Sequence, residues 1–212
     1  MPGKRGRPPK ESGAAEENRR AILSAAVRII RKNGAGALTV RSVCEEADVG
    51  NGTFYYHFKN KDDLLMSFLR ETTFDGFTLK TPVTEIPARV AELYMLLIDR
   101  YMALGLDFMK SFYSTGNRPL SAYMCEVNGR FEPGTVMARC ETELRTAQEQ
   151  GILNGETDIH ALGRDICTIV KGCVFEWCLT DGGIDLPAVL FRIIDGYMKQ
   201  FLSPAAIIGQ GR

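Results

Sequence analysis

The sequence has no apolar run of about 18 residues and no apolar core near its N-terminus. A membrane-spanning helix needs roughly 20 such residues, and a secretory signal needs an apolar segment of its own. We therefore expect a cytoplasmic protein that neither crosses a membrane nor is exported. Hydrophobic residues make up 45% of the 212 positions and charged residues 25%, as is typical of a globular chain.

The chain also lacks the short motifs that mark common enzymes. It contains no HExxH, no phosphate-binding loop with its lysine, no GxSxG and no dinucleotide-binding glycine pattern. We therefore predict that the protein is not an enzyme and has no cofactor.

Metal-binding side chains are few and poorly spaced. Only two histidines are present, and His160 stands alone, as a surface residue would. Cys167, Cys173 and Cys178 share one expected helix, where 100° per residue puts Cys173 on another side and Cys178 about 16 Å along the axis from Cys167. These thiols cannot chelate one ion, so we predict no metal site.

The six cysteines sit mostly in apolar sequence, which favours reduced, buried thiols. A redox sensor that works through Cys125, Cys140 or Cys173 remains an alternative interpretation. Alkylation of those thiols would then abolish the response to DNA.

A net charge of zero hides a division along the chain. Residues 1–61 contain twelve Lys and Arg against six Asp and Glu, whereas the remainder contains fourteen against twenty. A basic N-terminal part on an acidic body is the asymmetry expected of a DNA-binding protein.

Residues 38–65, LTVRSVCEEADVGNGTFYYHFKNKDDLL, predict two short helices joined by a tight turn and the start of a third. Thr39 is a good N-cap for the first helix, and Asp48 and Gly50 tolerate the backbone angles of a turn. In the second helix, Phe54 and Phe58 lie four residues apart and should face inward.

This layout is that of a helix-turn-helix, whose second helix presents its first residues to bases in the major groove. The side chains left outside are those of Asn51, Gly52, Thr53, Tyr56 and His57. Asn60 can cap the next helix, where Lys61 and the free amides would hold a phosphate. The alternative is an ordinary helical hairpin with half-buried tyrosines.

The segment resembles the DNA-binding region of the tetracycline-repressor (TetR) family over roughly residues 19–68. The matching positions are Thr39, Ala47, Val49, Gly52, Thr53, Tyr55, His57, Phe58, Lys61, Leu64 and Leu65. The resemblance implies phosphate contacts at Thr39, Tyr55 and Lys61, and DNA-facing positions at Asn51, Gly52, Thr53 and Tyr56. Gly50 departs from the usual serine or threonine and would remove a capping or phosphate contact.

We expect three parts: a flexible basic arm at 1–17, a helix-turn-helix domain at 18–70 and a helical effector-binding and dimerisation domain at 71–212. Arg5 and Arg7 flank a glycine in the arm, as in a minor-groove AT-hook. The alternative is a solvated tail. The fold class is therefore all-α.

Apolar periodicity in the larger domain predicts helices over about 84–104, 133–150, 158–179 and 186–202. Their aromatic, methionine and thiol side chains suggest a largely apolar ligand pocket. The candidates are Tyr94, Met102, Phe108, Phe112, Tyr113, Met137, Cys140 and Trp177.

The last two helices carry more apolar surface than one body can hide, which suggests a partner surface. The resemblance implies a homodimer through these helices. The candidate dimer residues are Ile166, Val170, Leu190, Ile194, Tyr197 and Phe201.

Taken together, these features predict a ligand-responsive regulator, most simply a repressor. The dimer would bind a pseudo-palindromic double-stranded DNA operator, and a small apolar molecule in the body would change the spacing of the two DNA-binding domains. A redox-sensing regulator and a non-enzymatic adaptor that keeps the fold are the alternatives.

Overall fold

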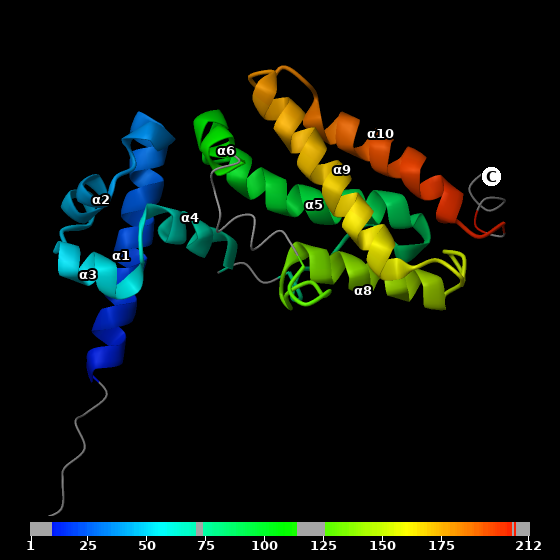
Figure 1. Cartoon of the computed structure of the whole chain (residues 1–212), viewed down its shortest axis with the longest axis horizontal. Helices are drawn as coiled ribbons and strands as arrows, with labels where there is room; N and C mark the ends of the chain where they lie inside the picture. The colour runs from blue at the N-terminus through cyan, green and yellow to red at the C-terminus, as the bar shows by residue number, and fades with distance from the viewer. Residues whose placement is uncertain (1–9, 71–73, 114–125, 205, 207–212) are drawn as a thin grey trace, which may run out of the picture. The chain divides into compact units, whose positions relative to one another are not determined.

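The computed structural model describes residues 10–70, 74–113, 126–204 and 206 (Figure 1). These residues form α-helices joined by turns, and within them β-structure is limited to two isolated bridges, Val127 with Arg130 and Leu153 with Leu202. The predicted all-α fold class is confirmed. No helix in the described part of the chain has both the length and the apolar character of a membrane span.

The chain divides into two compact units, which we call the head (Met1–Phe68) and the body (Leu69–Arg212). The head contains α1 (Lys10–Asn33), α2 (Val40–Ala47), α3 (Asn51–His57) and most of α4 (Lys61–Arg70). Both α2 and α3 pack on α1 (Figure 1). The head core consists of Ile22, Ala25, Ala26, Ile29, Ile30, Leu38, Val43, Phe54, Phe58, Leu64 and Leu65.

The first helix is longer than the sequence suggested. It begins at Lys10, so the second half of the segment 1–17, which we expected to be disordered, is helical. Alanine, lysine and glutamate favour helix there, and extending an existing packed helix requires no new nucleation. The helix ends at Asn33, because Gly34 adopts a φ of 78° and its N–H donates to the Ile30 carbonyl at 2.9 Å.

The body is built around α5 (Ile86–Met102). This helix packs on α6 (Leu106–Phe112), α8 (Val136–Glu149) and α10 (Leu186–Met198), while α9 (Ile159–Leu179) packs on α6, α8 and α10 (Figure 1). The central position of α5 explains why its sequence is apolar on nearly all sides.

Helix α8 starts later than predicted. Pro133 lies before the helix, and the Thr135 hydroxyl accepts a hydrogen bond from the Ala138 N–H at 3.2 Å as the N-cap. The side-chain cap, rather than the proline, therefore fixes where this helix begins.

Buried charges fix the connection that precedes α5, residues 74–81. Glu143 of α8 is 5% exposed and pairs with Arg89 of α5 and Arg139 of α8, each at 2.7 Å. Arg89 donates onward to the Thr81 carbonyl, and Arg139 donates to the Asp75 carbonyl at 2.6 Å. One carboxylate thus holds two guanidinium groups that together anchor this connection to the body.

Candidate nucleic-acid interface

The turn between α2 and α3 is set by its capping residues. Thr39 caps α2: its hydroxyl accepts from the Ser42 N–H at 3.0 Å, and the Ser42 hydroxyl accepts from the Thr39 N–H at 3.0 Å. At the other end, Asp48 adopts a left-handed φ of 54°. Gly50 precedes α3 and gives it no side-chain cap, as its departure from the usual serine or threonine indicated.

Two phenylalanines anchor α3 to the head. Phe54 is fully buried, Phe58 is 2% exposed, and their ring centroids lie 5.7 Å apart. The Arg19 guanidinium stacks 4.9 Å from the Phe58 ring. The inward orientation predicted for both phenylalanines is confirmed, and it fixes which side of this seven-residue helix faces solvent.

The solvent side of α3 carries polar and aromatic groups. Asn51 and Gly52 are exposed, Thr53 is half-buried, and Tyr55 and Tyr56 are 58% and 77% exposed. Large aromatic side chains this exposed are unusual on a helix that packs only against its own domain. The ordinary hairpin with half-buried tyrosines is therefore not what the structure shows.

His57 differs from its neighbours because it is half-buried and its ring meets that of Tyr56 edge-on at 4.9 Å. Burial, followed by the positive charge of Arg19, lowers the pKa of His57 below its ordinary value. The imidazole is therefore neutral at physiological pH and can offer a hydrogen bond but no full charge.

Lys61 is exposed in the first turn of α4. Asn60 caps this helix by accepting from the Asp63 N–H at 2.8 Å, and the Asp63 carboxylate accepts from the Lys59 N–H at 3.0 Å. The predicted cap is confirmed, and it leaves the Lys61 ammonium free to reach a phosphate. Arg5 and Arg7, the other predicted cationic contacts, lie outside the described residues.

Residues 22–67, which span α2, α3 and their packing against α1 and α4, match the family model described as bacterial regulatory proteins, tetR family. The head therefore resembles the DNA-binding region of the TetR family. Along its length it is 24% identical over 211 residues to the HTH-type transcriptional repressor BepR of Brucella suis, covering 91% of this chain and 96% of BepR.

Solved structures, one of them of a tetR regulator, share this fold. TylP of Streptomyces fradiae superposes with a TM-score of 0.60 at 20% identity, covering 93% of this chain and 85% of TylP. SmeT in complex with triclosan superposes with a TM-score of 0.62 at 19% identity, covering 89% of this chain and 93% of SmeT. BepR and TylP are named as regulators rather than enzymes, and the part of this chain that matches the family model contains the helix-turn-helix.

The structure separates the predicted ligand residues into different places. Tyr94, Phe108, Met137, Cys140 and Trp177 are all buried in the body. The remaining three are Met102 and Tyr113, which are half-buried, and Phe112, whose side chain lies outside the described part.

Only some of these residues meet. Tyr94 of α5 and Cys140 of α8 interact directly, and Cys167 of α9 joins them. Trp177 lies ten residues beyond Cys167 on α9, which is about 15 Å along the helix axis. There the indole of Trp177 lies next to Gly182, in the turn that follows α9. Trp177 therefore belongs to the packing of the α9–α10 turn rather than to the Tyr94 cluster.

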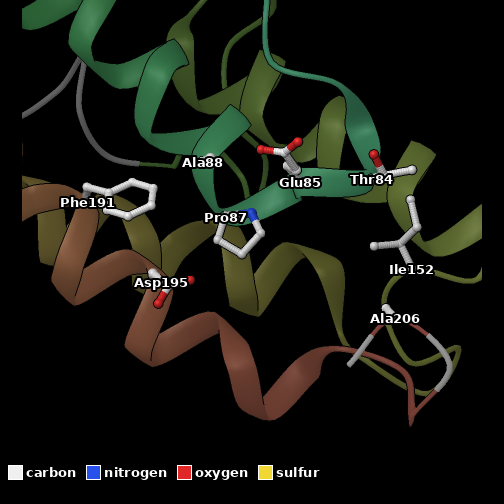
Figure 2. Close-up of a pocket in the computed structure, with 8 residues that line it drawn as sticks. All are labelled: Thr84, Glu85, Pro87, Ala88, Ile152, Phe191, Asp195 and Ala206. Carbon is white, nitrogen blue, oxygen red and sulfur yellow. The ribbon is translucent and has the colours of Figure 1, made fainter. Parts of the chain in front are cut away.

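A cavity of about 620 Å³ opens elsewhere in the body, between the start of α5 and α10 (Figure 2). Its lining residues are Thr84, Glu85, Pro87, Ala88, Ile152, Phe191, Asp195 and Ala206. None of them was among the predicted ligand residues. Four separate stretches of the chain form this cavity, so no local sequence pattern marks it.

Four of the predicted dimer residues require correction. Ile166, Val170, Leu190 and Ile194 are at most 1% exposed within a single chain, so they form the body core and present no surface to a partner. An amphipathic helix turns its most continuous apolar stripe inward, and the sequence alone did not show which stripe that was. Tyr197 and Phe201 are half-buried, with ring centroids 5.4 Å apart.

Large apolar side chains that are exposed on the same two helices were missed. They are Phe175 and Leu179 on α9, 48% and 63% exposed, and Phe191 on α10, 47% exposed. The spacing of four between Phe175 and Leu179 puts them on one helix face, a signal that the sequence did contain.

The described cysteines are buried thiols. Burial raises the pKa of Cys140 and, despite the opposing charge of Arg192, that of Cys173. A raised pKa suppresses the reactive thiolate, which disfavours redox sensing through these two residues. Cys125 lies outside the described residues, and no group of three metal-ligating side chains is found among those described.

Proposed function

We propose that this chain is a ligand-responsive transcriptional repressor that binds a pseudo-palindromic operator as a homodimer and is released by a small, largely apolar molecule. The observation that carries the proposal is the solvent side of α3. Asn51, Gly52 and Thr53 occupy its first turn, and Tyr56 is 77% exposed, on a helix whose opposite side is buried through Phe54.

The first turn of a recognition helix is the part that reaches base edges, and small Gly52 permits close approach. Thr39 and Lys61 are exposed on the flanking elements and Tyr55 on α3 itself, where phosphate contacts would fix the register of the helix on the duplex. His57 would assist as a neutral hydrogen-bonding group.

Exposed Phe175, Leu179 and Phe191 support a second copy of this chain as the partner of α9 and α10. Two-fold symmetry of such a dimer would match a pseudo-palindromic site. For the effector, the support comes from the buried, mostly apolar body interior and from a neighbour of the same fold, SmeT, which was solved with triclosan.

The test is operator binding by the purified protein. Fluorescence anisotropy against DNA upstream of its own gene, over a salt series and with footprinting, should give a steep salt dependence and a protected pseudo-palindrome. Weak binding without a footprint there, and no specific fragment in a genome-wide selection, would favour the adaptor alternative.

A further inference from the structure

Tyr94 is a buried residue of the body whose polar atom is left unpaired by the packing. It lies in the middle of α5 and is completely buried, yet its hydroxyl has no hydrogen-bond partner among the residues that the structure describes. A phenylalanine would fill the same space without a buried, unsatisfied hydroxyl. The hydroxyl oxygen of Tyr94 can therefore form a hydrogen bond with a bound molecule, since no described side chain of the body forms one with it.

The polar groups that act on this hydroxyl are the thiols of Cys140 and Cys167. A thiol is only a weak donor and a weak acceptor, so neither replaces an oxygen or nitrogen partner. Burial, with these thiols as a smaller influence, raises the pKa of Tyr94 well above its ordinary value. Burial likewise raises the pKa of Cys140, so phenol and thiol are both neutral at physiological pH.

A second phenol, that of Tyr113 at the end of α6, interacts with Cys167 of this cluster. Burial, followed by the charges of Cys167 and Cys178, raises the pKa of Tyr113. Helices α5, α6, α8 and α9 thus converge on a cluster of neutral polar groups. Most buried side chains one helical turn from Tyr94, Cys140 and Cys167 are apolar, and the exception is the paired carboxylate of Glu143. The apolar ones include Val90, Leu97, Ile98, Met137, Leu144 and Val170.

The charges of this region are already paired. Arg89 on α5 and Arg139 on α8 are committed to Glu143, each at 2.7 Å. A ligand carboxylate placed among the thiols would have no cation of its own, and a buried unpaired charge is strongly unfavourable. An uncharged ligand meets no such penalty.

We propose that Tyr94 is the hydrogen-bonding residue of the effector site and that the effector is an uncharged, mostly apolar molecule with one oxygen that pairs with this phenol. The inference rests on the proposed ligand-responsive function and specifies its site and ligand class. Met137 lies one turn from Cys140, and its unbranched side chain can repack to admit a ligand.

The test uses three probes that share one ring system: 2-naphthol, 2-methylnaphthalene and 2-naphthoate. Equilibrium dialysis against the full-length protein gives the Kd of each. The unchanged chain should bind 2-naphthol more tightly than 2-methylnaphthalene, and 2-naphthoate most weakly. Tyr94→Phe should weaken 2-naphthol about tenfold, the worth of one buried hydrogen bond, and leave 2-methylnaphthalene unchanged.

Tyr101→Phe is the matched control, because Tyr101 is also a buried tyrosine of α5, 3% exposed. It should not alter the affinity for any probe. Tyr94→Phe removes only an unpaired oxygen, so it should fold with at least the thermal stability of the unchanged chain. Equal affinity of the unchanged chain for all three probes, or no loss of 2-naphthol affinity in Tyr94→Phe, would overturn the inference.

Because dialysis involves no DNA, the experiment tests the effector site independently of the proposed repressor function. A chain that binds its operator but does not distinguish the probes overturns the effector site alone. A chain that distinguishes the probes through Tyr94 but binds no operator keeps the site and removes the proposed repressor function.

Discussion

Lys61 and Thr53 both lie on the exposed side of the helix-turn-helix, yet different physics governs their expected contacts. An ammonium group at the start of α4 would meet phosphates, which are the same in every sequence. A hydroxyl in the first turn of α3 would meet base edges, which differ. The two roles make opposite predictions for substitution.

Lys61→Ala should weaken binding to all DNA sequences alike and should reduce the slope of log affinity against log salt by about one. Anisotropy titrations over a salt series, on operator and non-operator DNA, measure both effects. Lys199→Ala removes a surface lysine of the body that pairs with Asp195 at 2.7 Å, and it should leave the slope unchanged. A loss confined to one sequence would contradict the phosphate role.

Thr53→Ala should change the preference among operator variants by about 1 kcal/mol at the base pairs nearest the first turn of α3, with the salt slope preserved. A systematic set of single-base-pair substitutions in the operator, each titrated at one salt concentration, shows this directly. If every variant lost the same factor, the side chain would have no base-reading role.

For single residues, the sequence predicted those features that depend only on residue type and on neighbours in the same or the next turn. The Thr39 cap, the left-handed Asp48, the Asn60 cap and the inward Phe54 and Phe58 all follow from residue type and spacing, and the structure bears them out. Each depends on neighbours within about four residues.

Among the elements, the connection before α5 depends on a single carboxylate. Glu143→Gln should lower the free energy of unfolding by about 3 kcal/mol, because it leaves the half-buried Arg89 and Arg139 without a counter-charge. Urea denaturation followed by circular dichroism measures the loss. Glu149→Gln alters an exposed residue of the same helix and should cost almost nothing. Equal stability of the two variants would refute the anchoring role.

His160 was expected at the surface and alone, but it lies between two carboxylates. Its Nδ1 is 3.0 Å from Glu141 of α8 and its Nε2 is 3.3 Å from Glu126, while Arg145 and Arg164 approach the same carboxylates at 2.9 Å and 3.9 Å. The hydrogen bond to Glu141 raises the pKa of His160; burial opposes this, and the charges of both glutamates add to it.

The expected pH dependence follows from that direction. Because the folded pKa lies above the unfolded value of about 6.5, the stabilisation is complete at lower pH and is lost as pH rises through the folded pKa. NMR titration of the two imidazoles should show His160 titrating above its ordinary value and His57 below. His160→Gln should remove the loss of stability that occurs as pH rises through the folded pKa of His160. If His160 titrated at its ordinary pKa, its pairing with Glu126 and Glu141 would be excluded.

For the whole molecule, the prediction concerns assembly. Phe175→Glu with Leu179→Glu should shift the protein from a dimer to the 23.5 kDa of one chain and weaken operator binding. Sedimentation equilibrium gives the mass. Val127→Glu charges another exposed apolar position, 54% exposed, and should leave the dimer intact. A dimer that survives the double substitution would place the partner surface elsewhere.

The sequence by itself determined the helix-turn-helix, the all-helical class and the TetR resemblance, because capping, turns and helical periodicity act over a few residues. It did not determine which apolar stripe of α9 and α10 faces inward, and it placed Ile166 and Leu190 at a partner surface rather than in the core. It also could not show that Tyr94, Cys140 and Cys167 meet, or that Glu143 holds two arginines. Those contacts join helices far apart in the chain, and only their packing against one another decides them.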